Sequence, residues 1–119
     1  MIPVVRRAAP AALILVASLA SAHPTLVGSS PKAGERLDVA PKQLRLSFNE
    51  PVEPAFTTVK LVSPSGKEGP AERTQAVESD ARAVVSPLDV PGPGLYKARW
   101  SALGRDGHRV NGEFSFTVK

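Results

Sequence analysis

The two histidines of this 119-residue chain, His23 and His108, are its clearest candidates for metal chemistry. His108 follows Asp106 and Gly107, and residues two apart in an extended segment point to the same side. The carboxylate and the imidazole could therefore bind one ion together or form a hydrogen-bonded pair. The loop alone is weak evidence, because Asp-Gly is a common turn and a loop histidine is usually only solvated.

His23 directly follows residues 20–22, whose sequence Ala-Ser-Ala has the small side chains that a signal peptidase recognises. A short basic start and an apolar run of signal-peptide length precede this stretch. We expect residues 1–22 to be a signal peptide cleaved after Ala22, which leaves residues 23–119 as the mature domain. The alternative is an N-terminal membrane anchor, although the apolar run is too short to span a bilayer comfortably.

Cleavage after Ala22 would convert the backbone nitrogen of His23 into an amine. This amine and the ring Nδ1 of the same residue can chelate one metal ion, the ring of His108 would add a third nitrogen, and Asp106 or water would add an oxygen. Such nitrogen and oxygen ligands suit Cu(II), whereas zinc prefers a tetrahedral set and is the second choice. Pro24 has no backbone N–H, so copper could not bind a deprotonated amide there and would need ligands from elsewhere in the fold.

Charge and sulfur content argue against several other classes of protein. The chain has 15 basic and 11 acidic residues, a net charge of +4, and loss of Arg6 and Arg7 with the signal peptide would leave 13 against 11. The remaining basic residues are scattered, so we expect no nucleic-acid partner. The chain has no cysteine and its one methionine is Met1, so the mature domain would offer a soft metal no sulfur. No second apolar stretch is long enough to span a membrane.

Short β-type segments must position these residues. Several of them alternate apolar with polar side chains, which predicts strands with one buried face. The candidate strands are residues 25–30, 43–48, 56–62, 82–88, 95–102 and 112–119. The polar segment 66–81 could be a loop or an edge strand. About seven short strands separated by turns predict one all-β domain, a small antiparallel Greek-key β-sandwich or barrel.

The segment between the last two candidate strands contains the Asp106–His108 pair. Gly104, Gly107 and Gly112 surround this pair. Glycine is common where the backbone takes a conformation that other residues avoid, so we expect a loop with several special backbone positions.

Three stretches together resemble the CopC family of periplasmic copper-binding proteins, including its YobA-like members: HPTLVGSSPKAGE, LSFNEPVE and GLYKARWSALGRDGHRVNGEFSFTVK. The resemblance covers essentially all of residues 23–119, with a minor departure in the spacing before Asp106. It implies a cupredoxin-like or immunoglobulin-like sandwich. It also implies that the N-terminus meets the Asp-Gly-His loop and forms a Cu(II) site from the amine and ring of His23, the ring of His108, and Asp106. Glu50 matches an acidic position near this site, as an outer ligand or as a group that contacts a ligand.

The resemblance further implies a periplasmic protein, not an enzyme, that carries or buffers one Cu(II) ion for copper homeostasis or resistance. The usual partner in the family is the inner-membrane copper protein CopD, which nothing in this chain identifies. Some members bind Cu(I) through a methionine-rich loop, which this chain lacks. Two alternatives remain. The same ligands form the histidine brace of copper oxygenases, although no aromatic face for a polymer is evident, and a sandwich can also be a metal-free binding module.

Overall fold

A computed structural model of the chain describes residues 1–12, 14 and 23–119. The regular structure in these residues is nine strands and one 3-10 turn, η1 (Pro54–Phe56), with no α-helix among them. The expected cleavage site at residues 20–22 lies outside the described residues. The all-β fold class predicted from the sequence is confirmed.

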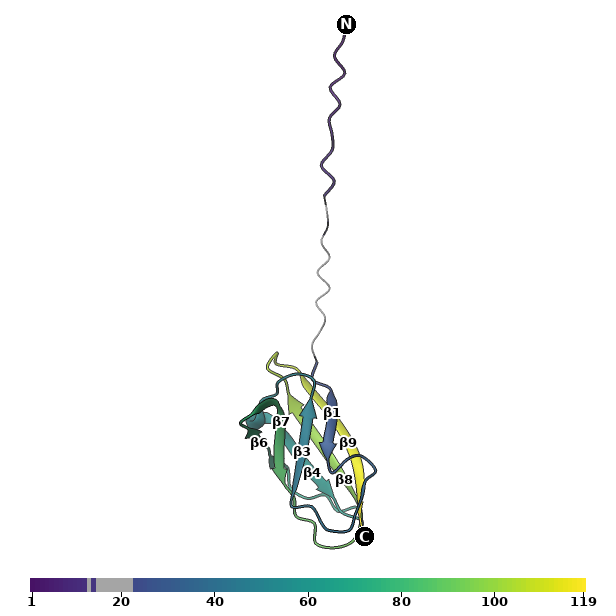
Figure 1. Ribbon diagram of the computed structural model, residues 1–119, viewed down its shortest axis with the longest axis vertical. Coiled ribbons are helices and arrows are strands. Elements are labelled where there is room, and N and C mark those ends of the chain that lie inside the picture. Colours follow the sequence, from purple (N-terminus) through teal and green to yellow (C-terminus); the bar gives the residue numbers. More distant parts are fainter. Residues whose placement is uncertain (13, 15–22) are drawn as a thin grey trace.

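The strands form two sheets that pack face to face (Figure 1). The four-stranded sheet has the order β1 (Leu26–Ser30), β3 (Gln43–Phe48), β7 (Asp80–Pro87), β6 (Gln75–Val77). The five-stranded sheet has the order β2 (Arg36–Leu37), β9 (Arg109–Val118), β8 (Gly94–Leu103), β4 (Thr58–Val62), β5 (Glu72–Arg73). Neighbouring strands are antiparallel except β2, which runs parallel to β9. The predicted antiparallel β-sandwich is thus confirmed.

The strand count differs from the prediction of about seven because three of the nine strands are very short. The six predicted strands correspond to β1, β3, β4, β7, β8 and β9. The polar segment 66–81 contains β5 and β6, each at the edge of a different sheet, and β2 lies between the first two candidate strands, where the sequence predicts no strand. Strands of two or three residues are too short to show an alternating pattern, so the sequence gives little indication of them.

The core lies between the sheets and follows the alternation seen in the sequence. Leu44, Leu46 and Phe48 of β3 are at most 2% exposed. The ring of Phe48 meets that of Trp100 on β8 at an interplanar angle of 73° and a centroid distance of 5.4 Å, the edge-to-face geometry that aromatic pairs favour. Near the start of β8 and the end of β9, the ring of Tyr96 stacks on that of Phe116. The Phe48–Trp100 contact joins the two sheets, whereas Tyr96 and Phe116 are cross-strand partners within the five-stranded sheet. The chain has no cysteine, so no disulfide contributes.

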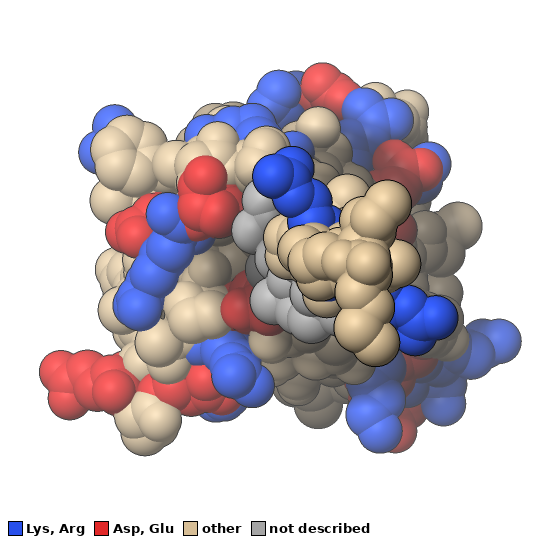
Figure 2. Space-filling view, turned by 90° about the horizontal axis from the view of Figure 1, so that it is seen from above, with Lys and Arg blue, Asp and Glu red and all other residues tan. Residues whose placement is uncertain are grey.

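The same architecture places two chain segments at one end of the sandwich. Strands β8 and β9 pair along ten residues, from Gly94↔Val118 to Leu103↔Arg109, so the turn at 104–108 projects from the end of a long hairpin. The chain enters β1 at this same end (Figure 1). Viewed from this end, acidic and basic side chains are interspersed around the visible face (Figure 2), as their scattered positions in the sequence predict.

Candidate metal centre

His23, Asp106 and His108 lie together at this end of the sandwich. Each offers a ligand atom, and these atoms all lie within 4.8 Å of one another. The ring of His23 approaches that of His108 edge-on, with 4.6 Å between centroids and 79° between the planes. Two ligands bound 2.0–2.1 Å from a metal are at most about 4.2 Å apart. Small side-chain movements would therefore suffice to close the cluster around one ion. All three residues are exposed, so an ion could enter and leave.

Asp106 and His108 form the hydrogen-bonded pair that the sequence suggested as one option. The carboxylate Oδ2 is 2.9 Å from the ring Nδ1 of His108, and Oδ1 accepts a hydrogen bond from the backbone N–H of His108 at 3.0 Å. A histidine held in this way through one ring nitrogen presents the other, here Nε2, to a metal. Because a carboxylate oxygen has more than one lone pair, Asp106 keeps acceptor capacity for an ion.

The same contacts change the acidity of Asp106. The hydrogen bonds from the ring and the backbone N–H of His108 hold the pKa of Asp106 below its ordinary value. The charges of His108 and His23 act in the same direction, and loss of hydration opposes them. The carboxylate is therefore ionised at neutral pH, which is the form that binds a cation.

We expect His108→Ala to raise the pKa of Asp106 toward its ordinary value, because the variant loses the ring hydrogen bond that stabilises the ionised carboxylate. The measurement is an NMR pH titration of the Asp106 carboxyl carbon. His23→Ala serves as the control and should raise the pKa less, since His23 acts on Asp106 only through its charge. An unchanged titration midpoint in His108→Ala would show that the ring hydrogen bond has no such effect.

The residues after His23 are held by the loop that follows β3, at Asn49, and by the loop that begins at Gly104. Pro24 is buried, and the backbone N–H of Thr25 donates to Oδ1 of Asn49 at 2.6 Å. The backbone N–H of Asn49 donates in return to the carbonyl of Thr25 at 3.0 Å. Asn49 cannot be identified as a site residue from the sequence, because an isolated asparagine after a strand forms no recognisable pattern.

Glu50 is the one predicted site residue that the structure does not bring into the cluster. It follows Asn49 beyond the end of β3 and is half-buried. Its carboxylate is not among the ligand atoms that meet within 4.8 Å. In this arrangement Glu50 is a neighbour in sequence of Asn49, which holds the N-terminal segment, and it is not one of the three clustered donors.

The three glycines near Asp106 and His108 do not all have the special backbone conformations that the sequence predicts. Gly107 alone of the three has a positive φ, 86°, and its N–H donates to the carbonyl of Gly104 to close the turn. Gly112 belongs to β9 and lies opposite Trp100 rather than in the loop. The prediction of several special backbone conformations is therefore wrong for Gly104 and Gly112, which are needed for close packing instead.

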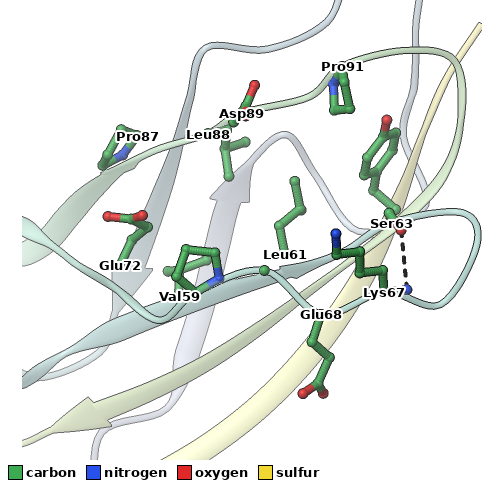
Figure 3. Close-up of a pocket in the computed structure, with 13 residues that line it drawn as sticks. Val59, Leu61, Ser63, Lys67, Glu68, Glu72, Pro87, Leu88, Asp89 and Pro91 are labelled. Carbon is green, nitrogen blue, oxygen red and sulfur yellow. Dashed lines mark hydrogen bonds between the residues drawn. The ribbon is translucent and has the colours of Figure 1, made fainter.

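A surface groove lies away from these ligands. It is a groove of about 490 Å³ between β4 and the β7–β8 connection, with Val59, Leu61 and Leu88 along its apolar wall (Figure 3). Tyr96 also lines it. None of its lining residues is a histidine, and none belongs to the His23, Asp106 and His108 cluster. In the described part of the chain, no helix is long and apolar enough to cross a membrane.

The fold and the clustered donors define a small β-sandwich protein with a candidate site for a metal that prefers nitrogen and oxygen ligands. A family model for the CopC domain matches residues 26–119, so the chain belongs to the CopC family, as its sequence resemblance predicts. This family comprises copper-binding and copper-resistance proteins rather than enzymes.

Two curated relatives are similar over most of this chain. Copper resistance protein C of Pseudomonas syringae pv. tomato is 35% identical over 115 residues, which cover 92% of this chain and 90% of that protein. The copper transport protein CutJ of Bacillus subtilis is 31% identical over 107 residues, which cover 89% of this chain. The matched region is only 20% of CutJ, so this chain corresponds to about one fifth of that longer protein.

Solved structures show the same fold. The crystal structure of CopC from Methylosinus trichosporium OB3b has a TM-score of 0.76 and 29% identity, covering 82% of this chain and 94% of that one. PcoC, a methionine-rich copper resistance protein from Escherichia coli, has a TM-score of 0.66 and 30% identity, covering 82% of this chain and 100% of that one.

Proposed function

We propose that this protein binds one Cu(II) ion at His23, Asp106 and His108 and carries or buffers it in the periplasm for copper resistance or homeostasis. The observation that carries the proposal is the convergence of the three side chains within 4.8 Å, at the residue where signal-peptide cleavage would create an amine. The names of its relatives, copper resistance protein C and copper transport protein, support copper as the metal.

The donors favour Cu(II) over other metals. In the full chain the nitrogen of His23 is part of a peptide bond, and cleavage after Ala22 would convert it into an amine that chelates together with the ring. Two imidazoles, an amine and a carboxylate suit Cu(II). The mature domain would contain no cysteine and no methionine, so it lacks the soft ligands that Cu(I) prefers. PcoC, in contrast, is described as methionine-rich.

We further propose that the partner is an inner-membrane copper protein such as CopD. The support is the similarity to CutJ, in which a region like this chain forms one fifth of a copper transport protein. Exposure of the three ligands is consistent with transfer, because a partner could reach the ion without unfolding the sandwich.

Mass spectrometry of the exported protein, followed by calorimetric titration with Cu(II), tests the proposal. The expected mass is that of residues 23–119, and the expected stoichiometry is one ion per chain. Retention of residues 1–22 would contradict the proposed amine ligand. Absence of tight Cu(II) binding by the correctly processed chain would favour a metal-free binding module.

Glu50→Gln tests the remaining predicted site residue. We expect the Cu(II) affinity to fall by no more than about tenfold, the lower end of the effect of groups that contact a metal ligand. The reason is that the Glu50 carboxylate lies outside the clustered donors. Glu53→Gln is a matched control, since Glu53 pairs with Arg105 at 3.7 Å. A loss in Glu50→Gln as large as that in Asp106→Asn, measured by chelator competition, would make Glu50 a ligand.

A further inference from the structure

The position of His23 depends on the residues that follow it. Strand β1 begins only at Leu26, and the His23 side chain is exposed, with the His108 ring as its aromatic neighbour. A chain end of this kind is usually poorly ordered unless other contacts tie it down. Once residues 1–22 are removed, the contacts of Pro24 and Thr25 must hold His23 near the loop.

Asn49 supplies the first of these contacts. It pairs with Thr25 through two hydrogen bonds, one from its backbone N–H and one to its side-chain Oδ1. Any residue except proline could donate the backbone hydrogen bond, but the bond at 2.6 Å needs an acceptor oxygen at the length of the asparagine side chain. The side chain of Asn49 thus fixes the backbone two residues after His23.

Gly104 allows the second contact, that of Pro24 with the loop, because it has no side chain. A Cβ at this position would lie 2.8 Å from Cγ of Pro24 and 2.6 Å from Oδ1 of Asp106. The φ of Gly104 is outside the left-handed region, so the glycine is required by space and not by backbone conformation. The N-terminal segment and the Asp106 carboxylate therefore pack against the same point of the loop.

We infer that Asn49 and Gly104 are positioning residues that set the separation between His23 and the Asp106–His108 pair before any metal binds. The inference rests on the proposed function for the identity of the ligand, Cu(II). The positioning is itself a property of the metal-free chain and can be measured without copper. Such preorganisation lowers the entropic cost of binding, because the first ligand does not have to be ordered by the ion.

The test uses the processed chain and its variants Asn49→Leu and Asn49→Asp. Because His23 and His108 are the chain's two histidines and their ring centroids lie 4.6 Å apart, we expect an NMR cross-peak between their ring protons in the metal-free protein. In Asn49→Leu we expect this cross-peak to weaken and the Cu(II) affinity to fall by about tenfold or more. Asn49→Asp keeps the acceptor oxygen and should retain the cross-peak, with Cu(II) affinity at least as high as the wild type.

Asn111→Leu is the matched control, because Asn111 is exposed on β9 outside the cluster, and it should change neither measurement. Thermal unfolding of each variant separates lost positioning from lost folding. Asn49→Ser, which withdraws the oxygen with a smaller change of polarity, is used if Asn49→Leu does not fold. Gly104→Ala should also weaken the cross-peak and the affinity.

An unchanged cross-peak and affinity in folded Asn49→Leu or Asn49→Ser would overturn the inference. Loss of the cross-peak in folded Asn49→Asp would also overturn it. If the cross-peak behaves as expected but no chain, wild type included, binds Cu(II), the proposed function fails and the positioning role stands.

Discussion

Replacing His108 by alanine in the processed chain is expected to lower its affinity for Cu(II) by more than about a hundredfold. Loss of a group that only orients a metal ligand typically costs about 10- to 100-fold. His108→Ala removes a ligand itself, and it also removes the ring that hydrogen-bonds Asp106. Two of the three clustered side chains are therefore affected by one substitution.

Competition with a chelator of known Cu(II) affinity measures this loss. Arg105→Ala is the control in the same loop, since its contact with Glu53 is a surface ion pair of the kind that contributes little. We expect its affinity to stay within about threefold of the wild type, because surface pairs are weak. If His108→Ala bound Cu(II) with wild-type affinity, His108 would not be a copper ligand and this loop would not be part of the site.

Replacing Gly112 by alanine is expected to destabilise the fold. Gly112 lies opposite Trp100 in the β8–β9 ladder, and a Cβ there would lie 2.4 Å from Cζ2 of the indole. Trp100 is 8% exposed and packs against Phe48, so it has little room to move. Overpacking of this kind costs about 1–3 kcal/mol.

Thermal unfolding checks this prediction. For a domain of this size each kcal/mol lowers Tm by roughly 4–8 °C. Gly28→Ala is the matched control, because Gly28 also lies in a strand and a Cβ there meets nothing within 4 Å. If the two variants had equal Tm values, the close packing of Trp100 on Gly112 would not limit stability.

The sequence predicts the long strands of the fold well, because each buries one face over many residues. Leu44, Leu46 and Phe48 alternate with polar residues and are buried as expected, and so are Tyr96 and Trp100. Short strands at the sheet edges bury too little for a pattern to form. The special role of Gly112 is also hidden, because it depends on an aromatic ring from the neighbouring strand.

The candidate site is predictable only in part. Residue types and spacing suggest that Asp106 and His108 act together, and the structure has them hydrogen-bonded. The meeting of His23 with this pair, 83 and 85 positions further along the chain, follows from the family resemblance and not from any local pattern. The contacts that hold it, at Asn49 and Gly104, arise from tertiary packing and leave no signal in one sequence.

The proposed cleavage after Ala22 would have a chemical consequence. If residues 1–22 are a signal peptide, as proposed, the reaction that removes them would also create the amine of His23. Before cleavage the chain would have the two imidazoles and the carboxylate but not the chelating amine. Tight copper binding would therefore begin only after export, which would keep the unprocessed chain from competing for copper.

Comparison of the chain that begins at His23 with one that carries a single extra glycine before His23 tests whether the amine of His23 is a copper ligand. Both are titrated with Cu(II) in competition with a chelator, and the bound copper is examined by EPR. We expect the extra glycine to lower the affinity by at least about a hundredfold, since a ligand is lost and not merely a group that orients one, and to change the EPR spectrum. Equal affinity and an unchanged spectrum would contradict this prediction.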